Sequence, residues 1–156
     1  MITIAPIPSD FADWQGLLSL ILQAFSYMDA VIDPPSSAHR LTPATLAEKA
    51  RDETGFLAHD GDTLVGCMFL KPETASLYVG KLAISPACQG RGIGRLLLQA
   101  AEAEAKRLNL PALRLDTRIE LVANHATFAA WGFAKTAEKS HPGYDRPTFI
   151  EMRKTL

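Results

Sequence analysis

Hydrophobic residues follow two different spacings along the chain, and each spacing predicts a different element. Residues 2–7 alternate isoleucine with smaller residues, which is typical of a half-buried strand. In residues 11–25 the large apolar side chains recur every three or four positions, which predicts an amphipathic helix. We expect the side chain of Ser9 or Asp10 to cap the first turn of this helix.

Proline, glycine and capping residues bound the remaining predicted elements. Thr42 followed by Pro43 is typical of a helix cap and a first helical residue. Asp60 with Gly61 is typical of a tight hairpin turn. The predicted strands cover residues 2–7, 56–59, 63–70, 76–84, 113–116, 134–138 and 148–154. The predicted helices cover residues 11–25, 43–53, 93–108 and 124–130, and the predicted loops cover residues 26–40 and 141–147.

A glycine-rich turn between a strand and a helix is the most informative stretch. Pro86 ends the strand, because proline lacks an amide hydrogen. Glycines then alternate with other residues, so successive backbone amides can point the same way. The following helix start adds about half a positive charge, and Arg91 and Arg95 add two full charges. A phosphate or pyrophosphate is therefore the ligand that best matches Gln89, Gly90, Arg91, Gly92, Ile93, Gly94 and Arg95.

Several phosphate-binding patterns compete for this stretch. A dinucleotide fingerprint needs a third glycine where the chain has Leu97, and a P-loop needs Gly-Lys-Ser/Thr, which is missing. An ordinary strand-to-helix turn with glycines by chance is a further alternative. The pattern Gln/Arg-x-x-Gly-x-Gly/Ala, preceded by Leu-Ala-Ile and a proline, does fit. With these residues the chain closely resembles the GCN5-related N-acetyltransferase (GNAT) family.

The resemblance implies a fold and a co-substrate. The fold is α/β (α+β): a mixed, mostly antiparallel twisted sheet flanked by about four helices, in a single three-layer domain over residues 1–156. The co-substrate is acetyl-CoA, whose diphosphate would lie on residues 89–95. Leu82, Ala83 and Ile84 would pair with the pantetheine, and the Ile84 amide would polarise the thioester oxygen. Such a fixed donor contributes about 3 kcal/mol in a transition state.

The residues expected for proton transfer depart from the family pattern. Many members have a glutamate six residues before the position of Ile84, where this chain has Tyr78. With an ordinary pKa of about 10, tyrosine is a poor base, so Tyr78 would orient a water, line the acceptor cleft or simply pack. Asn124 matches the family, and would contribute to the cofactor site together with Phe128, which replaces the usual acid tyrosine. Either Tyr144 or His141 supplies the proton, or the reaction runs without a donor.

Loops at both ends of the chain are expected to border the acceptor. The resemblance assigns Tyr27, Asp33 and His141 to substrate binding, because family members have loops at these places. Acidic and basic residues are balanced in these loops, so the sequence indicates no charge preference for the acceptor. Family members often pair, which leaves a homodimer open.

Composition limits the kinds of binding partner and the cellular compartment that we expect. With 156 residues, 47% hydrophobic content and a formal charge of -1, the chain has no electrostatic feature that favours nucleic acid or a membrane surface. Two cysteines, Cys67 and Cys88, are too few for a disulfide scaffold and fit a reducing cytoplasm. The four histidines are scattered, so no metal site is expected. The N-terminal residues do not resemble a signal peptide.

Three functions are compatible with these residues. The first is an N-acetyltransferase that moves an acetyl group from acetyl-CoA to a primary amine of a small molecule or peptide, by direct attack in a ternary complex. The second is a non-catalytic acyl-CoA-binding module, which the residues found at Tyr78 and Phe128 leave open. The third is a structural domain in which the glycine stretch is only a turn.

Overall fold

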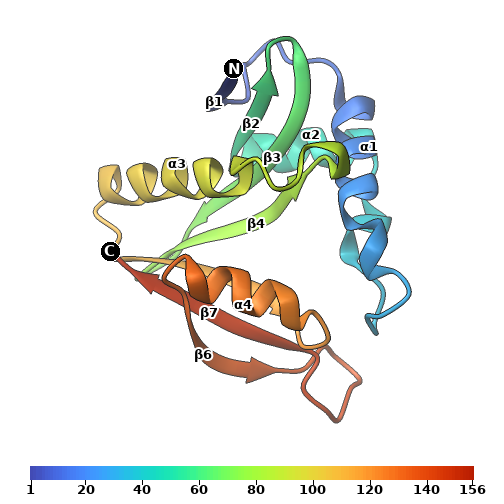
Figure 1. Ribbon diagram of the computed structural model, residues 1–156, viewed down its shortest axis with the longest axis vertical. Helices are drawn as coiled ribbons and strands as arrows, with labels where there is room; N and C mark the ends of the chain where they lie inside the picture. Colours follow the sequence, from blue (N-terminus) through green and yellow to red (C-terminus); the bar gives the residue numbers. More distant parts are fainter.

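A computed structural model describes residues 1–156 and shows one seven-stranded sheet with helices on both faces (Figure 1). The strand order is β1-β2-β3-β4-β5-β7-β6, and only the β4–β5 pair is parallel. The strands are β1 (Ile2–Pro6), β2 (Thr54–Asp60), β3 (Thr63–Pro72), β4 (Leu77–Ile84), β5 (Ala112–Arg118), β6 (Ala134–Lys139) and β7 (Phe149–Thr155). The helices are α1 (Trp14–Phe25), α2 (Pro43–Asp52), α3 (Ile93–Arg107) and α4 (Val122–Ala130).

The sheet separates two hydrophobic cores, because successive side chains of a strand point to opposite faces. Leu57, Cys67 and Phe69 pack with α1 and α2 on one face. Their neighbours Phe56 and Met68 pack with α3 on the other face. The chain therefore forms three layers, helices over sheet over helices, and the predicted fold class is confirmed (Figure 1).

Strands β4 and β5 pair over a short distance only. Their register contains just two residue pairs, Leu77 with Leu113 and Tyr78 with Arg114. Beyond this point the rest of β4 has no strand partner on the β5 side. A β-bulge lies in the same part of β4, because the register against β3 shifts there and Lys81 has a φ of 49°. A bulge of this kind bends the strand and re-aims its side chains.

The N-terminal cap of α2 agrees with the prediction, and the cap of α1 differs from it. The predicted Thr42 cap of α2 is confirmed, and it forms a capping box, since Thr42 and Thr45 bond each other's backbone amides. The predicted cap of α1 by Ser9 or Asp10 is wrong, because the carboxylate of Asp13 accepts the Gly16 amide at 3.0 Å. A Cβ at Gly16 would lie 2.2 Å from this carboxylate, so the glycine permits the cap.

Short helical turns replace part of two irregular stretches. The predicted loop at residues 26–40 contains η1 (Ser26–Met28) and η2 (Ser37–Arg40), and η3 (Pro86–Cys88) follows β4. Such 3₁₀ turns are common as connectors. None of the helices combines the length and the apolar character needed to cross a bilayer.

Candidate active site

The glycine stretch lies between η3 and α3 and presents free backbone amides. Gly90 and Gly92 have φ values of 81° and 77°, a conformation that side chains with a Cβ rarely adopt. None of the amides of residues 89–95 donates a hydrogen bond to another group of the protein. Together with the start of α3 these amides form a site suited to an anion, because helix starts carry partial positive charge.

A cleft of about 620 Å³ opens beside this stretch. It runs from the glycine stretch along the free edge of β4 to α4 and the end of α1, and we call it the first cleft. No charged side chain lines it. Its lining consists of Ala24, Phe25, Tyr27, Met28, Leu82, Ala83, Ile84, Cys88, Gln89, Gly90, Gly92, Ile93, Gly94, Asn124, Thr127, Phe128 and Trp131.

The structure thus brings together most of the residues expected to bind acetyl-CoA. Asn124 also meets Tyr27, because its side-chain amide donates a hydrogen bond to the Tyr27 hydroxyl at 3.0 Å. Phe128 packs edge to face against Trp131, with ring centroids 6.0 Å apart. The sequence analysis did not assign Trp131 to the site, although its spacing of three from Phe128 on a helix is a usable signal.

The two arginines of the glycine stretch behave differently from the expectation. Neither side chain lines the first cleft. Arg91 forms an ion pair with Asp60, with its Nη1 atom 3.0 Å from Oδ2. Arg95 instead lines a small hollow with Glu102 and Lys154. Asp60 at the β2–β3 turn thus engages the Arg91 guanidinium, and the Arg95 guanidinium lies outside the first cleft. The contribution of these two charges to phosphate binding stays a prediction.

A second cleft of about 420 Å³ adjoins the first. The two clefts share five lining residues, Phe25, Met28, Leu82, Asn124 and Phe128, which we call the junction. The second cleft alone is lined by Pro34, Pro35, Ser36, Ser37, Arg40, Tyr78, Val79, Gly80, Lys81, Leu115, Asp116, Thr117, Arg118, Leu121, His141 and Phe149.

Tyr78 lies in the second cleft but is poorly suited to accept a proton. The guanidinium carbon of Arg114 lies 4.4 Å from the centre of its ring. Burial raises the pKa of Tyr78 to about 12. The phenol is therefore fully protonated near neutral pH, which leaves it the roles of lining the cleft and orienting neighbours.

Only some of the residues expected to border the acceptor lie in one of the two clefts. His141 lines the second cleft, where its Nδ1 atom lies 2.5 Å from the Thr148 hydroxyl, and burial lowers the pKa of His141. Tyr144 and Asp33 line neither cleft. They meet each other instead, because the Tyr144 hydroxyl donates to Asp33 Oδ1 at 2.7 Å, a hydrogen bond that raises the pKa of Tyr144.

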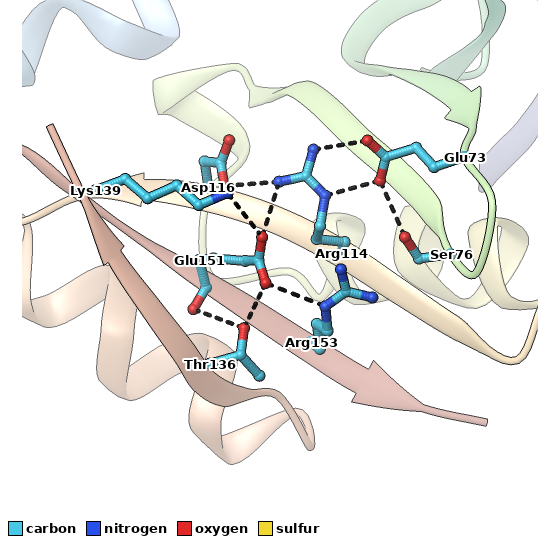
Figure 2. A network of polar contacts seen from close by, with 8 residues as sticks. All are labelled: Glu73, Ser76, Arg114, Asp116, Thr136, Lys139, Glu151 and Arg153. Atoms are coloured by element: carbon cyan, nitrogen blue, oxygen red, sulfur yellow. Dashed lines mark hydrogen bonds and ion pairs between the residues drawn. The ribbon is translucent and has the colours of Figure 1, made fainter. Parts of the chain in front are cut away.

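A network of paired charges lies on the strands beside the second cleft (Figure 2). Arg114 is at its centre and contacts Glu73 at 2.7 Å, Asp116 at 2.9 Å and Glu151 at 3.5 Å. Glu151 is 8% exposed and also accepts hydrogen bonds from Thr136, Lys139 and Arg153. Burial alone would raise the pKa of Glu151, but these donors lower it to about 2. The acidic groups of this wall are thus neutralised by their neighbours.

The basic residues of the second cleft were not foreseen. Arg40, Lys81 and Arg118 come from η2, β4 and β5, which are distant in sequence. Lys81 alone carries a signal, because it is a charged residue inside an otherwise apolar strand. No group of three or more histidine, cysteine, aspartate or glutamate side chains is placed to hold a metal ion.

An anion site of free amides at a helix start, beside a strand edge without a partner, is an arrangement that suits an acyl-CoA-dependent N-acyltransferase. Residues 14–133 match the model of a family described as Acetyltransferase (GNAT) family. The chain belongs to this family.

Relatives and solved structures agree with this assignment. An IAA acetyltransferase of Azospirillum brasilense is 33% identical over 125 residues, which are 79% of this chain and 80% of the relative. The fold is also similar to that of a ribosomal-protein-S18-alanine N-acetyltransferase from Escherichia coli, with a TM-score of 0.73, 18% identity and coverage of 99% and 94% of the two chains. A GNAT family acetyltransferase from Elizabethkingia anophelis with acetyl-CoA bound has a TM-score of 0.72 and 20% identity, with coverage of 99% and 98%.

Proposed function

We propose that this acetyltransferase moves the acetyl group of acetyl-CoA directly to a primary amine held in the second cleft, on a small molecule or peptide. Both substrates are bound together, and the amine attacks the thioester at the junction of the clefts. The observation that carries the proposal is that the two clefts share the junction residues Leu82, Asn124 and Phe128. A group bound in one cleft can therefore reach a group bound in the other.

The first cleft offers a binding surface for each part of acetyl-CoA. The diphosphate accepts hydrogen bonds from the free amides of residues 89–95, which have no partner within the protein. The pantetheine lies along Leu82, Ala83 and Ile84, where β4 has no strand neighbour. Backbone pairing of this kind is how extended ligands add to a sheet edge. The thioester then reaches the junction beside Phe128.

The departure of coenzyme A does not require a strong proton donor. The amine nitrogen forms a bond to the acetyl carbon, the carbon–sulfur bond breaks, and coenzyme A leaves as a thiolate. A thiol of pKa about 8.5 leaves without full protonation, and general acid catalysis contributes only about 10²–10⁴-fold. The phenylalanine at position 128 is compatible with this reaction. The amine attacks as the free base after its ammonium proton has passed to water, and a second proton leaves the nitrogen for water once the nitrogen–carbon bond has formed. Tyr78 with a pKa of about 12 takes neither proton.

Release of free thiol from acetyl-CoA tests the proposal. The enzyme is mixed with acetyl-CoA and a panel of primary amines, and thiol is followed by colour while the acetylated amine is identified by mass spectrometry. We expect thiol release that depends on both the amine and the enzyme, in equal amounts with acetylated product. A release that occurs without amine, followed by acetyl transfer from the enzyme, would contradict direct attack. Tight binding of acetyl-CoA without any transfer would contradict the proposed reaction altogether.

A further inference from the structure

Three cationic side chains converge on the second cleft without an acidic partner. Arg40, Lys81 and Arg118 all line it, and none of them forms an ion pair. Their hydrogen bonds go to neutral groups: Lys81 Nζ donates to the Ser37 hydroxyl at 2.6 Å, and Arg118 donates to backbone carbonyls of residues 34 and 35 at 2.6 and 3.1 Å. Free positive charge thus faces the cleft.

The nearby carboxylates do not cancel this charge. Asp116 is the only acidic residue of the lining, and Arg114 already holds it at 2.9 Å (Figure 2). Around the cleft, Asp33 forms an ion pair with Arg146 and Glu53 with Lys49, and Asp29 Oδ1 lies 2.7 Å from His39 Nε2. Glu120 accepts the Asp33 amide through Oε2, and its buried Oε1 has no partner. This carboxylate does not line the cleft, but its negative charge offsets part of the positive charge of Arg118. Acidic and basic residues are balanced in the loop sequences, but the second cleft has an excess of unpaired basic side chains.

The positive charges around the second cleft also repel one another. Burial, with Lys49, Arg40 and Arg118 nearby, lowers the pKa of Lys81 to about 8. A bound anion would relieve this repulsion, since an opposite charge close by favours the charged form. The cleft of about 420 Å³ falls within the range that accommodates small metabolites.

We propose that the acceptor amine carries an anionic group, as an amino acid carries its carboxylate, and that Arg40, Lys81 and Arg118 bind this group. The inference rests on the proposed function and adds the substrate class. The anion lies among the three cations, and the amine of the same molecule points to the junction. Charge-assisted hydrogen bonds from arginine are among the strongest that proteins make to carboxylates and phosphates.

Matched acceptors test the substrate class. Each of a series of amino acids is compared with its own carboxamide, and phosphoethanolamine is compared with ethanolamine, at constant ionic strength. We expect kcat/KM to be at least about tenfold higher for the anionic member of a pair, because a hydrogen bond to a charged group contributes roughly 1.5–3 kcal/mol. The two kinds of pair distinguish a carboxylate from a phosphate. Equal kcat/KM within every pair would overturn the inference, while the proposed acetyl transfer would stand.

Two variants test whether these cations bind the anionic group of the acceptor. In Arg40→Gln and Lys81→Met the preference for the anionic member should fall about tenfold, because kcat/KM for the anionic member should fall much more than kcat/KM for the neutral member. Arg40 lines the second cleft and makes no side-chain hydrogen bond or ion pair, so its substitution breaks no polar contact within the protein. The control is Arg107→Gln, whose guanidinium pairs with Glu104 at the end of α3.

A purely structural role gives a different result. If Arg40 or Lys81 only supported the fold, both members of each acceptor pair would lose kcat/KM in proportion and the preference would stay constant. Retention of the full preference in both variants would overturn the assignment of the cations. Absence of transfer to every amine would instead mean that the proposed function has failed.

Discussion

Replacing Gly92 with alanine tests whether the glycine stretch binds acetyl-CoA through its backbone. Gly92 is the N-cap residue of α3 and has a φ of 77°. A Cβ built there meets no atom within 4 Å, so the substitution causes no steric clash. Within the protein, the effect must therefore arise from the backbone conformation alone.

The expected magnitude follows from the cost of the left-handed conformation. That conformation costs a residue with a Cβ about 1–2 kcal/mol. No hydrogen bond within the protein holds the amides of residues 89–95, so the alanine variant can relax to a negative φ while it is free. Binding must then restore the original conformation. We expect the affinity for acetyl-CoA to fall about 5- to 30-fold, the factor that corresponds to this free energy.

Isothermal titration calorimetry with acetyl-CoA measures the effect in the absence of acceptor. Gly143→Ala is the matched control, because Gly143 has a φ of 86°, its Cβ also meets nothing within 4 Å, and it lines neither cleft. The control should bind acetyl-CoA like the unmodified protein. An unchanged affinity in Gly92→Ala, or the same loss in both variants, would refute the assignment of the diphosphate to these amides.

Three further substitutions have defined outcomes. Phe128→Ala should weaken acetyl-CoA binding in calorimetry, because the ring lines the first cleft and packs on Trp131; unchanged affinity would count against this placement. Tyr144→Phe should retain turnover and the shape of the pH profile, because the hydroxyl is bonded to Asp33 outside both clefts; a large loss of kcat would restore a role in proton transfer. Glu151→Gln should lower the free energy of unfolding at pH 7 by about 3 kcal/mol, because the pKa of Glu151 is about 2 in the folded protein against an ordinary 4.5. This carboxylate stabilises the fold above its ordinary pKa, and the stabilisation is lost as the pH falls from about 4.5 to about 2. In urea unfolding the difference between Glu151→Gln and the unmodified protein should therefore shrink at pH 3, and a constant difference would exclude this linkage.

Local chemistry accounts for the parts of the fold that were predicted well. The Thr42 and Pro43 helix start and the Asp60–Gly61 turn depend on neighbouring residues only, so sequence spacing is enough to find them. The start of α1 was placed too early because Phe11 fits the apolar spacing of the helix although it precedes it. The cap at Asp13 becomes evident only with the contact to Gly16.

The first cleft was largely predictable and the second was not. Residues of the first cleft cluster in the strand, turn and helix around the glycine stretch, so one continuous segment contains much of the site. Residues of the second cleft come from segments that only folding brings together, among them Arg40, Lys81 and Arg118. No spacing in the sequence reports such a convergence.

The sequence by itself determined the alternation that gives the sheet two buried faces and the glycines that leave the anion site open. Both properties follow from the conformational preferences of single residues and their neighbours. Only the tertiary structure decided which charged and polar side chains are held by a partner within the protein. Arg91 is engaged by Asp60, 31 residues away, and Tyr144 by Asp33, 111 residues away. An ion pair or hydrogen bond depends on distance in space, so the charge of the second cleft is a property of the fold.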